Sequence, residues 1–390
     1  MDIKKLPIIG IIFGTTLILS SIILFVLNNQ NDIEGNSFEQ SIKYANVNDL
    51  ELEETEIDKS IDSFPTIESD NEEEEDEKEY FIKESGWIPN WGFDLGMESL
   101  ENNRGIIDTV NPVLYSVDSR GNVVSRGVSN ANIERLLDYC RNNSIRVIPT
   151  IGSFDYDAMR TAFSSNESYK GHINTIVSEI DRYGFDGIDL DYEMINIDQK
   201  EFFLNFLRDL KNELDSRNKV LSVTVFPQWE NGIYTDHQDT RAVQDYSVIG
   251  DIADEVRIMT YDYTLQTSKE PGPIAPINWM RDVLDYAIKY IPKEKIWLGI
   301  HLYGYQWSRD RTVAFTYTTT ESAIINSGIN NIFREDIGEG YAEFTCDGDF
   351  LCKAYFQTPR GVQIRRDIAR EYGIAGVSYW RLGGEVDILK

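Results

Sequence analysis

The nine residues FDGIDLDYE, Phe185–Glu193, constrain the fold more than any other segment of the chain. Alternate side chains of a strand share one face, so the acids that end this segment point one way and the apolar residues between them point the other. The acidic face carries Asp189, Asp191 and Glu193. Burying several carboxylates together is costly unless they share protons or hydrogen bonds. We therefore interpret this face as a proton-handling cluster, in which Asp189 and Asp191 titrate as a pair.

The acidic strand has two other interpretations. A solvated edge strand does not fit the apolar alternation, and two metal ligands one residue apart would need further ligands that the sequence does not show. The three histidines lie far apart and lack the ligand spacing of a zinc site. They are His172, His237 and His301, and we expect each to be structural. We therefore predict no metal and no cofactor.

From Tyr80 onward, strand-like and helix-like segments alternate, which predicts an α/β fold with a closed (β/α)₈ TIM barrel. An open doubly wound sheet is the alternative, but no glycine-rich phosphate loop follows the first strand. The expected strands are Gly86–Trp91, Val110–Ser116, Arg146–Ile151, Gly187–Glu193, Val220–Phe226, Val256–Tyr261, Lys295–His301 and Ala375–Trp380. Asp198 and Glu201 form the expected capping box of one helix.

The barrel is not expected to be regular. Residues 308–355 form an extra stretch between strand seven and the following helix, Pro359–Tyr372. The runs VAFTYTTT and YAEFTC predict short strands around one helix, Glu321–Ser327, and so a small α+β insertion. Cys346 and Cys352 lie close enough in sequence for a disulfide that closes a small loop, whereas Cys140 is expected to be a buried free thiol.

The N-terminus contains the clearest targeting signal. The segment Leu6–Asn28 carries no charge and is long enough to cross a bilayer as a helix. It lacks the shorter apolar core and small-residue cleavage site of a signal peptide, so we expect an uncleaved anchor in residues 1–30. Lys4 and Lys5 precede the span, which predicts a cytoplasmic N-terminus and the bulk of the chain outside the membrane. A buried core helix is the alternative.

The charge of the chain is concentrated. The formal net charge is −29, and residues 31–80 hold 19 acidic and 3 basic residues. The segment 31–79 is therefore expected to be a disordered acidic stalk, followed by the barrel in residues 80–390. No basic stripe offsets this field, which argues against nucleic acid as a partner. We expect a monomer.

The acidic strand and several other motifs resemble one family. DGIDLDYE matches every fixed position of the DGxDxDxE signature of glycoside hydrolase family 18, the chitinase family. MTYDY, LGIHLYGYQW and GVSYWRLGGE resemble its motifs for strands six, seven and eight, in the expected order. The last of these, with PGPIAPINWMRDVLDYAIKYIP, resembles the bacterial branch that includes spore cortex-lytic N-acetylglucosaminidases. The likeness covers about residues 80–385.

The resemblance implies a role for each matched residue. Glu193 would be the general acid, Asp191 would hold the acetamido group, and Asp189 would exchange a proton with Asp191. The nucleophile would be the 2-acetamido oxygen of the substrate, an exception to the usual pair of carboxylates. The implied substrate contacts are Tyr261, Asp262, Trp380, Thr150 and Tyr303. The first Asp of the signature, Asp186, has the opposite parity and is expected to be structural.

Three departures from the family pattern are visible. The third-strand motif SxGG is Thr150–Ser153 here, which keeps a hydroxyl to support the acid pair but loses one glycine. The first strand reads GWIPNW where a tyrosine is common, so the sequence leaves open which residue takes the place of that partner of the acid pair. Gln306 stands where acidic or basic residues are usual. We expect these changes to alter subsite preference more than chemistry.

The resemblance implies hydrolysis, with retention, of bonds next to N-acetylglucosamine. The rival interpretations are a sugar-binding, lectin-like pseudoenzyme and a surface interaction domain on a stalk. The presence of Glu193 favours the enzyme, because lectin-like members of the family have lost this acid. Chitin, peptidoglycan glycan strands and N-linked glycans all offer the acetamido group. The likeness to the cortex-lytic branch favours peptidoglycan or a related wall polymer.

Overall fold

The computed structural model describes residues 81–230, 232, 238–317, 324, 329–346, 350–385 and 387–390. The expected anchor in residues 1–30 and the expected stalk in residues 31–79 lie outside this part of the chain. Among the residues that the structure describes, no helix has both the length and the apolar character needed to cross a membrane.

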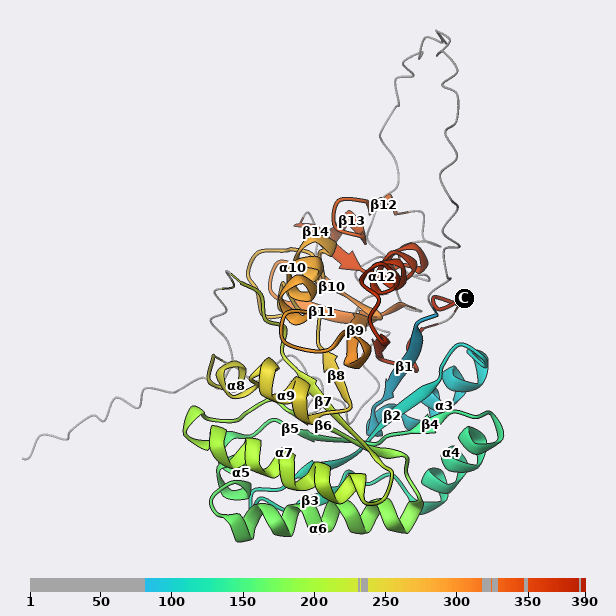
Figure 1. Ribbon diagram of the computed structural model, residues 1–390. Coiled ribbons are helices and arrows are strands. Elements are labelled where there is room, and N and C mark those ends of the chain that lie inside the picture. The colour runs from blue at the N-terminus through green and yellow to red at the C-terminus, as the bar shows by residue number, and fades with distance from the viewer. Residues whose placement is uncertain are drawn as a thin grey trace, which may run out of the picture.

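A closed barrel of parallel strands forms the centre of the described chain (Figure 1). Strand β1 completes the ring by pairing with both β15 and β2. The prediction of a TIM barrel is therefore confirmed. The barrel strands are β1 (Lys83–Ile88), β2 (Thr109–Val117), β4 (Arg146–Val147) with β5 (Thr150–Ser153), β6 (Gly187–Tyr192), β7 (Val220–Val225), β8 (Glu255–Ile258), β9 (Ile296–His301) and β15 (Gly376–Trp380). A short strand, β3 (Val123–Ser125), pairs antiparallel with β2.

Prolines explain where two strands differ from expectation. The predicted strand Arg146–Ile151 is divided into β4 and β5, because Pro149 lies between them and has no N–H for the ladder. The first strand begins three residues earlier than predicted and ends at Ile88, because Pro89 stops the pairing. Residues Asn90–Gly92 then form a 3₁₀ turn instead of strand.

Helices cover the outside of the barrel (Figure 1). They are α3 (Phe93–Asn102), α4 (Asn130–Asn142), α5 (Tyr156–Ala162), α6 (Asn166–Tyr183), α7 (Lys200–Asp215), α8 (Gln238–Val243), α9 (Tyr246–Ile252), α10 (Ile277–Ala287) and α12 (Pro359–Tyr372). The predicted capping box at Asp198 and Glu201 is wrong. A 3₁₀ turn precedes α7, so the box lies earlier, where the side chain of Gln199 accepts from the backbone N–H of Asn196.

The apolar face of β6 packs against these helices, as predicted. The ring of Tyr192 stacks on Phe206 of α7 at 6.3 Å between centroids. Its hydroxyl lies 2.5 Å from Nε2 of His172 on α6, and burial lowers the pKa of this histidine to about 4. Cys140 on α4 is a buried free thiol, as predicted.

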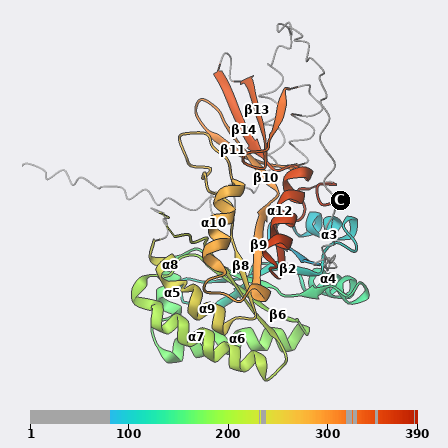
Figure 2. The same ribbon diagram turned by 45° about the horizontal axis from the view of Figure 1, so that its top comes forward.

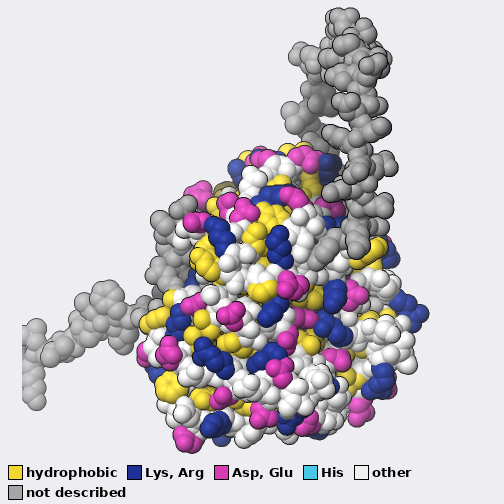
Figure 3. All heavy atoms as spheres, viewed as in Figure 1, with side chains coloured by type: hydrophobic (Ala, Val, Ile, Leu, Met, Phe, Trp, Pro, Cys, Tyr) yellow, Lys and Arg dark blue, Asp and Glu magenta, His cyan; other side chains and the backbone are white. Residues whose placement is uncertain are grey.

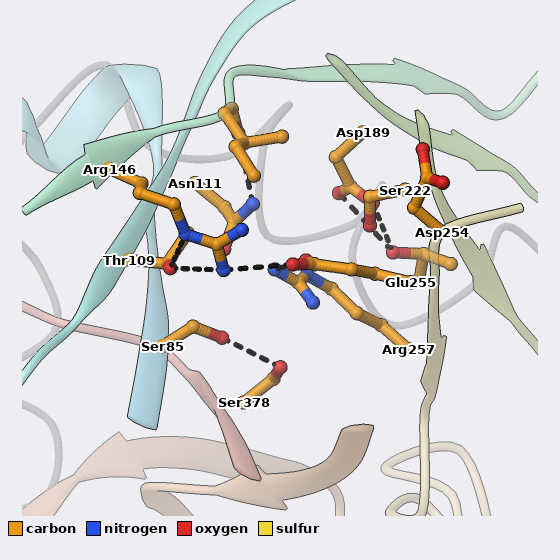
Figure 4. Close-up of polar contacts among 12 residues, drawn as sticks. Ser85, Thr109, Asn111, Arg146, Asp189, Ser222, Asp254, Glu255, Arg257 and Ser378 are labelled. Atoms are coloured by element: carbon orange, nitrogen blue, oxygen red, sulfur yellow. Dashed lines mark hydrogen bonds and ion pairs between the residues drawn. The ribbon is translucent and has the colours of Figure 1, made fainter. Parts of the chain in front are cut away.

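Polar side chains fill the N-terminal half of the barrel interior (Figure 4). Arg257 is fully buried, and its guanidinium pairs with Glu255 at 2.7 Å and lies over the ring of Trp297 at 4.5 Å. Glu255 also pairs with Arg146 of β4 at 2.8 Å. These charges compensate one another in the interior, which is how a barrel core can hold them.

The insertion is an antiparallel sheet that rises beside the barrel (Figure 2). Its order is β11–β10–β14–β13–β12, from β10 (Tyr303–Trp307), β11 (Thr312–Thr316), β12 (Asn331–Arg334), β13 (Glu339–Cys346) and β14 (Phe350–Phe356). The sheet thus starts at Tyr303, directly after β9. A disulfide joins Cys346 to Cys352. The predicted helix Glu321–Ser327 lies outside the described residues, apart from Ile324.

A buried ion pair fastens this sheet to the barrel. Glu339 of β13 is fully buried and accepts hydrogen bonds from the backbone N–H groups of Ile274 and Ala275, which precede α10. Arg365 of α12, also fully buried, lies 3.4 Å from the same carboxylate.

On the outer surface, acidic and basic side chains are interspersed over the face shown in Figure 3.

Candidate active site

Asp189 is the best-satisfied carboxylate of the acidic strand. It is fully buried in the barrel interior and accepts hydrogen bonds from four side chains on three other strands, β1, β5 and β7. Thr150 Oγ1 and Trp87 Nε1 donate to Oδ2 at 2.8 and 3.2 Å. Ser222 Oγ and Thr224 Oγ1 donate to Oδ1 at 2.7 and 3.0 Å. Four donors of this kind compensate a buried carboxylate for the loss of water.

The next two carboxyl groups lack such partners. Oδ1 of Asp191 and Oε1 of Glu193 are buried without a hydrogen bond from any described residue. Burial, and then the neighbouring charge of Asp189, raise the pKa of Asp191 to about 8, although Arg126 opposes the shift. Burial raises the pKa of Glu193 well above its usual value, with added repulsion from Asp191 and Asp262. Burial therefore favours the protonated form of both outer carboxyl groups.

The backbone of Glu193 is fixed at the end of β6. Its N–H donates to the carbonyl of Ser153 at 2.9 Å, and its carbonyl accepts from Thr240 Oγ1 at 3.0 Å. Its side chain is 2% exposed. Carboxylates two residues apart on a strand are roughly 7 Å apart along the chain, so Glu193 lies one such step above Asp191.

A second group of residues follows β8 and β9. Asp262 has a left-handed backbone, with φ of 58°, which turns the chain away from the strand direction. Its Oδ1 accepts from the hydroxyls of Tyr303 and Tyr305 at 2.5 and 2.7 Å. Tyr261 is almost buried, and burial together with Asp191 raises the pKa of its hydroxyl well above its usual value. That hydroxyl is therefore a stable hydrogen-bond donor.

A cavity opens above the acidic strand, at the C-terminal ends of the barrel strands. Its empty space is about 980 Å³, part of it open to solvent. Active sites of TIM barrels lie at this end. The lining residues are Pro89, Asn90, Trp91, Val113, Arg126, Phe154, Asp191, Tyr261, Asp262, Gln266, Leu302, Tyr303, Tyr305, Ala314, Phe315, Thr316, Trp380, Arg381 and Gly384.

The structure brings most of the predicted site residues to this cavity. Asp191 and four of the five expected substrate contacts line it. Thr150 does not, which corrects its assignment as a substrate contact: it is fully buried below the cavity, where its hydroxyl supports Asp189. Glu193 is not part of the lining, although the charges of two lining residues, Asp191 and Asp262, raise its pKa.

Two residues singled out in the sequence lie away from the cavity. Asp186 is structural, since its Oδ2 accepts from the backbone N–H of Val147 at 2.7 Å. Gln306 is buried in the insertion sheet, where its Nε2 lies 3.8 Å from Sγ of Cys352. Because side chains alternate along β10, Tyr303 and Tyr305 face the cavity and Gln306 faces away. The expected effect of Gln306 on subsites is therefore wrong.

Sequence reasoning missed four residues around the acid cluster. Trp87 of the first strand donates a hydrogen bond to Asp189, in place of the tyrosine that is common in that strand. Ser222 and Thr224 alternate in VLSVTV, and this period of two could have placed both hydroxyls on the inner face of β7. Arg126 follows β3, and no sequence pattern pointed to it. Among the described residues, no group of acids, histidines or cysteines could hold a metal ion.

Comparison with known proteins identifies the family. The profile of "Glycosyl hydrolases family 18" matches residues 55–385. The chain is similar to the cortical fragment-lytic enzyme of Bacillus subtilis (strain 168), with 28% identity over 217 residues, 54% of this chain and 49% of that protein. The protein of the same name from Bacillus anthracis is 28% identical over 238 residues, 60% of this chain and 54% of that one. The chain thus spans about half the length of these relatives.

Solved structures share the fold. A chitinase from Chromobacterium violaceum superimposes with a TM-score of 0.72 at 20% identity, covering 79% of this chain and 96% of that one. The spore cortex-lytic enzyme SleL of Bacillus megaterium superimposes with a TM-score of 0.70 at 21% identity, covering 79% of this chain and 72% of that one.

Proposed function

The chain belongs to family 18 of the glycosyl hydrolases, and from this membership we propose that it hydrolyses β-glycosidic bonds next to N-acetylglucosamine by retaining, substrate-assisted catalysis. One observation carries the proposal. A single strand holds a carboxylate satisfied by four donors, Asp189, followed by two carboxyl groups with raised pKa values, Asp191 and Glu193. A hydrogen-bonded carboxylate followed by two carboxyl groups with raised pKa values is suited to storing and moving a proton.

Glu193 is the general acid of the proposed reaction. Such a group must keep its proton at the working pH and release it to the leaving oxygen. Burial and the nearby carboxylates raise the pKa of Glu193, which satisfies the first condition. Its Oε1 forms no hydrogen bond with any described residue, so no other protein group competes with the glycosidic oxygen for this atom.

The substrate supplies the nucleophile in this proposal. The 2-acetamido oxygen attacks the anomeric carbon while the bond to the leaving oxygen breaks and Glu193 protonates that oxygen. Asp191 accepts the acetamido N–H and stabilises the positive oxazolinium, and Asp189 exchanges a proton with Asp191 as this charge develops. Water then gives a proton to the Glu193 carboxylate and opens the oxazolinium from the face that the leaving group vacated, which restores the acid and the original configuration.

Aromatic and polar residues of the cavity hold the reacting sugar. Tyr261 donates its hydroxyl to the acetamido oxygen, a role that requires the protonated phenol that burial secures. Trp380 forms the apolar floor below the ring. Asp262, positioned by Tyr303 and Tyr305, accepts from a sugar hydroxyl.

A wall polymer is the preferred substrate within this proposal. The similar proteins carry names that refer to the lysis of spore cortex and its fragments, whereas others are named chitinases. Peptidoglycan glycan and chitin both contain the acetamido group that the mechanism needs.

Product analysis tests the proposal. The protein and its Glu193→Gln variant are incubated with chitooligosaccharides and with purified peptidoglycan, and products are read by mass spectrometry. New N-acetylglucosamine reducing ends from the wild type alone support the proposal. Tight oligosaccharide binding without any product would identify a sugar-binding protein built on a hydrolase barrel.

Membrane attachment remains a prediction from the sequence. The uncharged segment Leu6–Asn28 supports a single-pass anchor that places the barrel on the outer side of the membrane. The test is fractionation of cells that produce the full chain, followed by protease treatment of intact cells. Membrane-bound protein that the external protease removes supports this arrangement, and protein in the soluble fraction contradicts it.

A further inference from the structure

One cation in the cavity has no part in the proposed chemistry. Arg126 follows β3 and lines the cavity together with Asp191 and Tyr261. Its backbone N–H donates to the carbonyl of Leu114 at 2.8 Å, which extends the β2–β3 hairpin to this point. The hairpin therefore delivers a guanidinium to the mouth of the acid cluster.

The guanidinium is held in a defined place. Its Nε donates to Oδ1 of Asn90 at 3.1 Å, and Nδ2 of Asn90 donates back to the carbonyl of Arg126 at 3.3 Å. Its Nη1 lies over Gly152, where an added Cβ would come within 3.8 Å of it. Gly152 is the β5 partner of Asp191 in the strand register. The two outer nitrogens of Arg126 thus remain beside the reacting end of β6.

Among the described residues, no carboxylate lies within ion-pair distance of the Arg126 guanidinium, whose side-chain hydrogen bond goes to Asn90. Asp191 is the carboxylate that acts on its pKa, and burial keeps Asp191 protonated up to a pKa of about 8. A cation at this position also disfavours the positive oxazolinium that the proposed reaction forms. Both costs fall if the substrate brings its own anion to the guanidinium.

Resting on the proposed function, we propose that Arg126 is a specificity-determining residue that binds a carboxylate carried by the glycan. The matching group is the carboxylate on the 3-O-lactyl substituent of a muramic acid residue. Arginine suits this task, since its planar fork forms paired, charge-assisted hydrogen bonds with a carboxylate. Arg381, which stacks on Trp91 at 4.1 Å, adds a second guanidinium to the same cavity. Chitin, which is neutral, offers no carboxylate to Arg126.

The test compares two substrates that differ only in this charge. Glycan strands are freed of peptide by an amidase, which exposes the lactyl carboxylates, and half of the sample is carboxyl-reduced to the neutral alcohol. The measured quantity is the ratio of kcat/KM for the acidic strands to that for the reduced strands. It is determined for the wild type, Arg126→Gln, Arg126→Lys and Arg120→Gln. Arg120 is a matched control, because it lies in the same hairpin but is exposed and paired with Asp118.

We expect the wild type to prefer the acidic strands. Arg126→Gln should lower the ratio about 10- to 100-fold, the value of a hydrogen-bonded charge pair, and Arg126→Lys should keep part of it. Arg120→Gln should leave the ratio as it is. An Arg126→Gln variant that loses activity equally on both strands would overturn the proposal and make Arg126 a partner of Asp191. A wild type that cleaves chitooligosaccharides without preferring acidic strands would also overturn it, while the proposed function would stand. Failure to cleave any of these substrates would instead refute the proposed function.

Discussion

The indole Nε1 of Trp87 donates a hydrogen bond to Oδ2 of Asp189 across 3.2 Å of the barrel interior. The two residues lie on β1 and β6, 102 positions apart in sequence. The bond completes the set of donors around the deepest carboxylate, in a chain whose first strand lacks the tyrosine that the family pattern provides. The same function is thus served by a different side chain on the same strand.

Replacing Trp87 by Phe should lower both stability and turnover. The variant loses a hydrogen bond to a buried charge, which contributes about 1.5–3 kcal/mol, in addition to packing. Urea unfolding and kcat on chitooligosaccharides measure the two effects. Trp279→Phe is a suitable control, because the indole N–H of Trp279 is buried without a partner in the described part of the chain. Equal losses of kcat in the two variants would show that the bond to Asp189 has no special role.

Glu193→Gln should lower kcat by two to four orders of magnitude, the usual contribution of a general acid, while leaving oligosaccharide binding largely intact. Asp191→Asn should also be severe, because an amide can neither exchange a proton with Asp189 nor carry the charge that stabilises the oxazolinium. Asp186→Asn provides the control within the same signature, since among the described residues the side chain of Asp186 bonds only to the backbone N–H of Val147 in β4. Turnover near the wild-type value in either of the first two variants would refute the mechanism.

The activity should extend further into the alkaline range than an ordinary carboxyl group would allow. The reaction needs a protonated Glu193, and its pKa is raised by burial and by Asp191 and Asp262. The value of kcat/KM should therefore hold through neutral pH and fall only as the cluster loses its proton, since this parameter reports the free enzyme. A profile that already declines near pH 5 would mean that Glu193 titrates like an exposed glutamate.

The stability of the protein should depend on pH through Asp191. Its pKa is about 8 in the folded protein and about 4 in an unfolded chain. The folded state binds the extra proton in this interval, so the contribution of Asp191 is fully present below about pH 4 and is lost by about pH 8. Asp191→Asn should therefore gain in free energy of unfolding, relative to the wild type, as the pH rises from 5 to 8. Parallel pH curves for the two proteins would exclude this linkage.

Breaking the ion pair between the insertion sheet and the barrel should be costly. Glu339→Gln leaves the buried guanidinium of Arg365 without its counter-charge, and we expect a loss of about 3 kcal/mol or more in the free energy of unfolding. Glu371→Gln breaks the exposed pair with Arg281 and should cost less than about 1 kcal/mol. Chemical unfolding compares the two variants. Similar losses in the free energy of unfolding would contradict a stabilising role of the buried Glu339–Arg365 pair.

The sequence predicted the barrel because strands buried on both faces have a recognisable composition and helices alternate with them. Its errors are local. Pro89 and Pro149 moved strand ends by two or three residues, and a 3₁₀ turn moved the cap of α7. The sequence predicted only part of the antiparallel sheet, because β10 follows β9 so closely that the two resemble one continuous strand.

The acid strand could be found from sequence because its signal is contained in nine consecutive residues. Trp87 and Arg126 could not, because each acts across the barrel on a residue more than 60 positions away, and neither contact leaves a periodic pattern. Thr150 shows the opposite error. Its motif was recognised, but only the fold shows that strand β5 buries it below the cavity.

The measurement that tests the central claim most directly is the configuration of the first product. Proton NMR recorded during cleavage of a chitooligosaccharide distinguishes the anomers before they interconvert. Attack by the substrate's own acetamido oxygen, with Glu193 as the acid, predicts that the β-anomer forms first. Initial formation of the α-anomer would contradict the account, because it would require direct attack by water from the opposite face of the sugar.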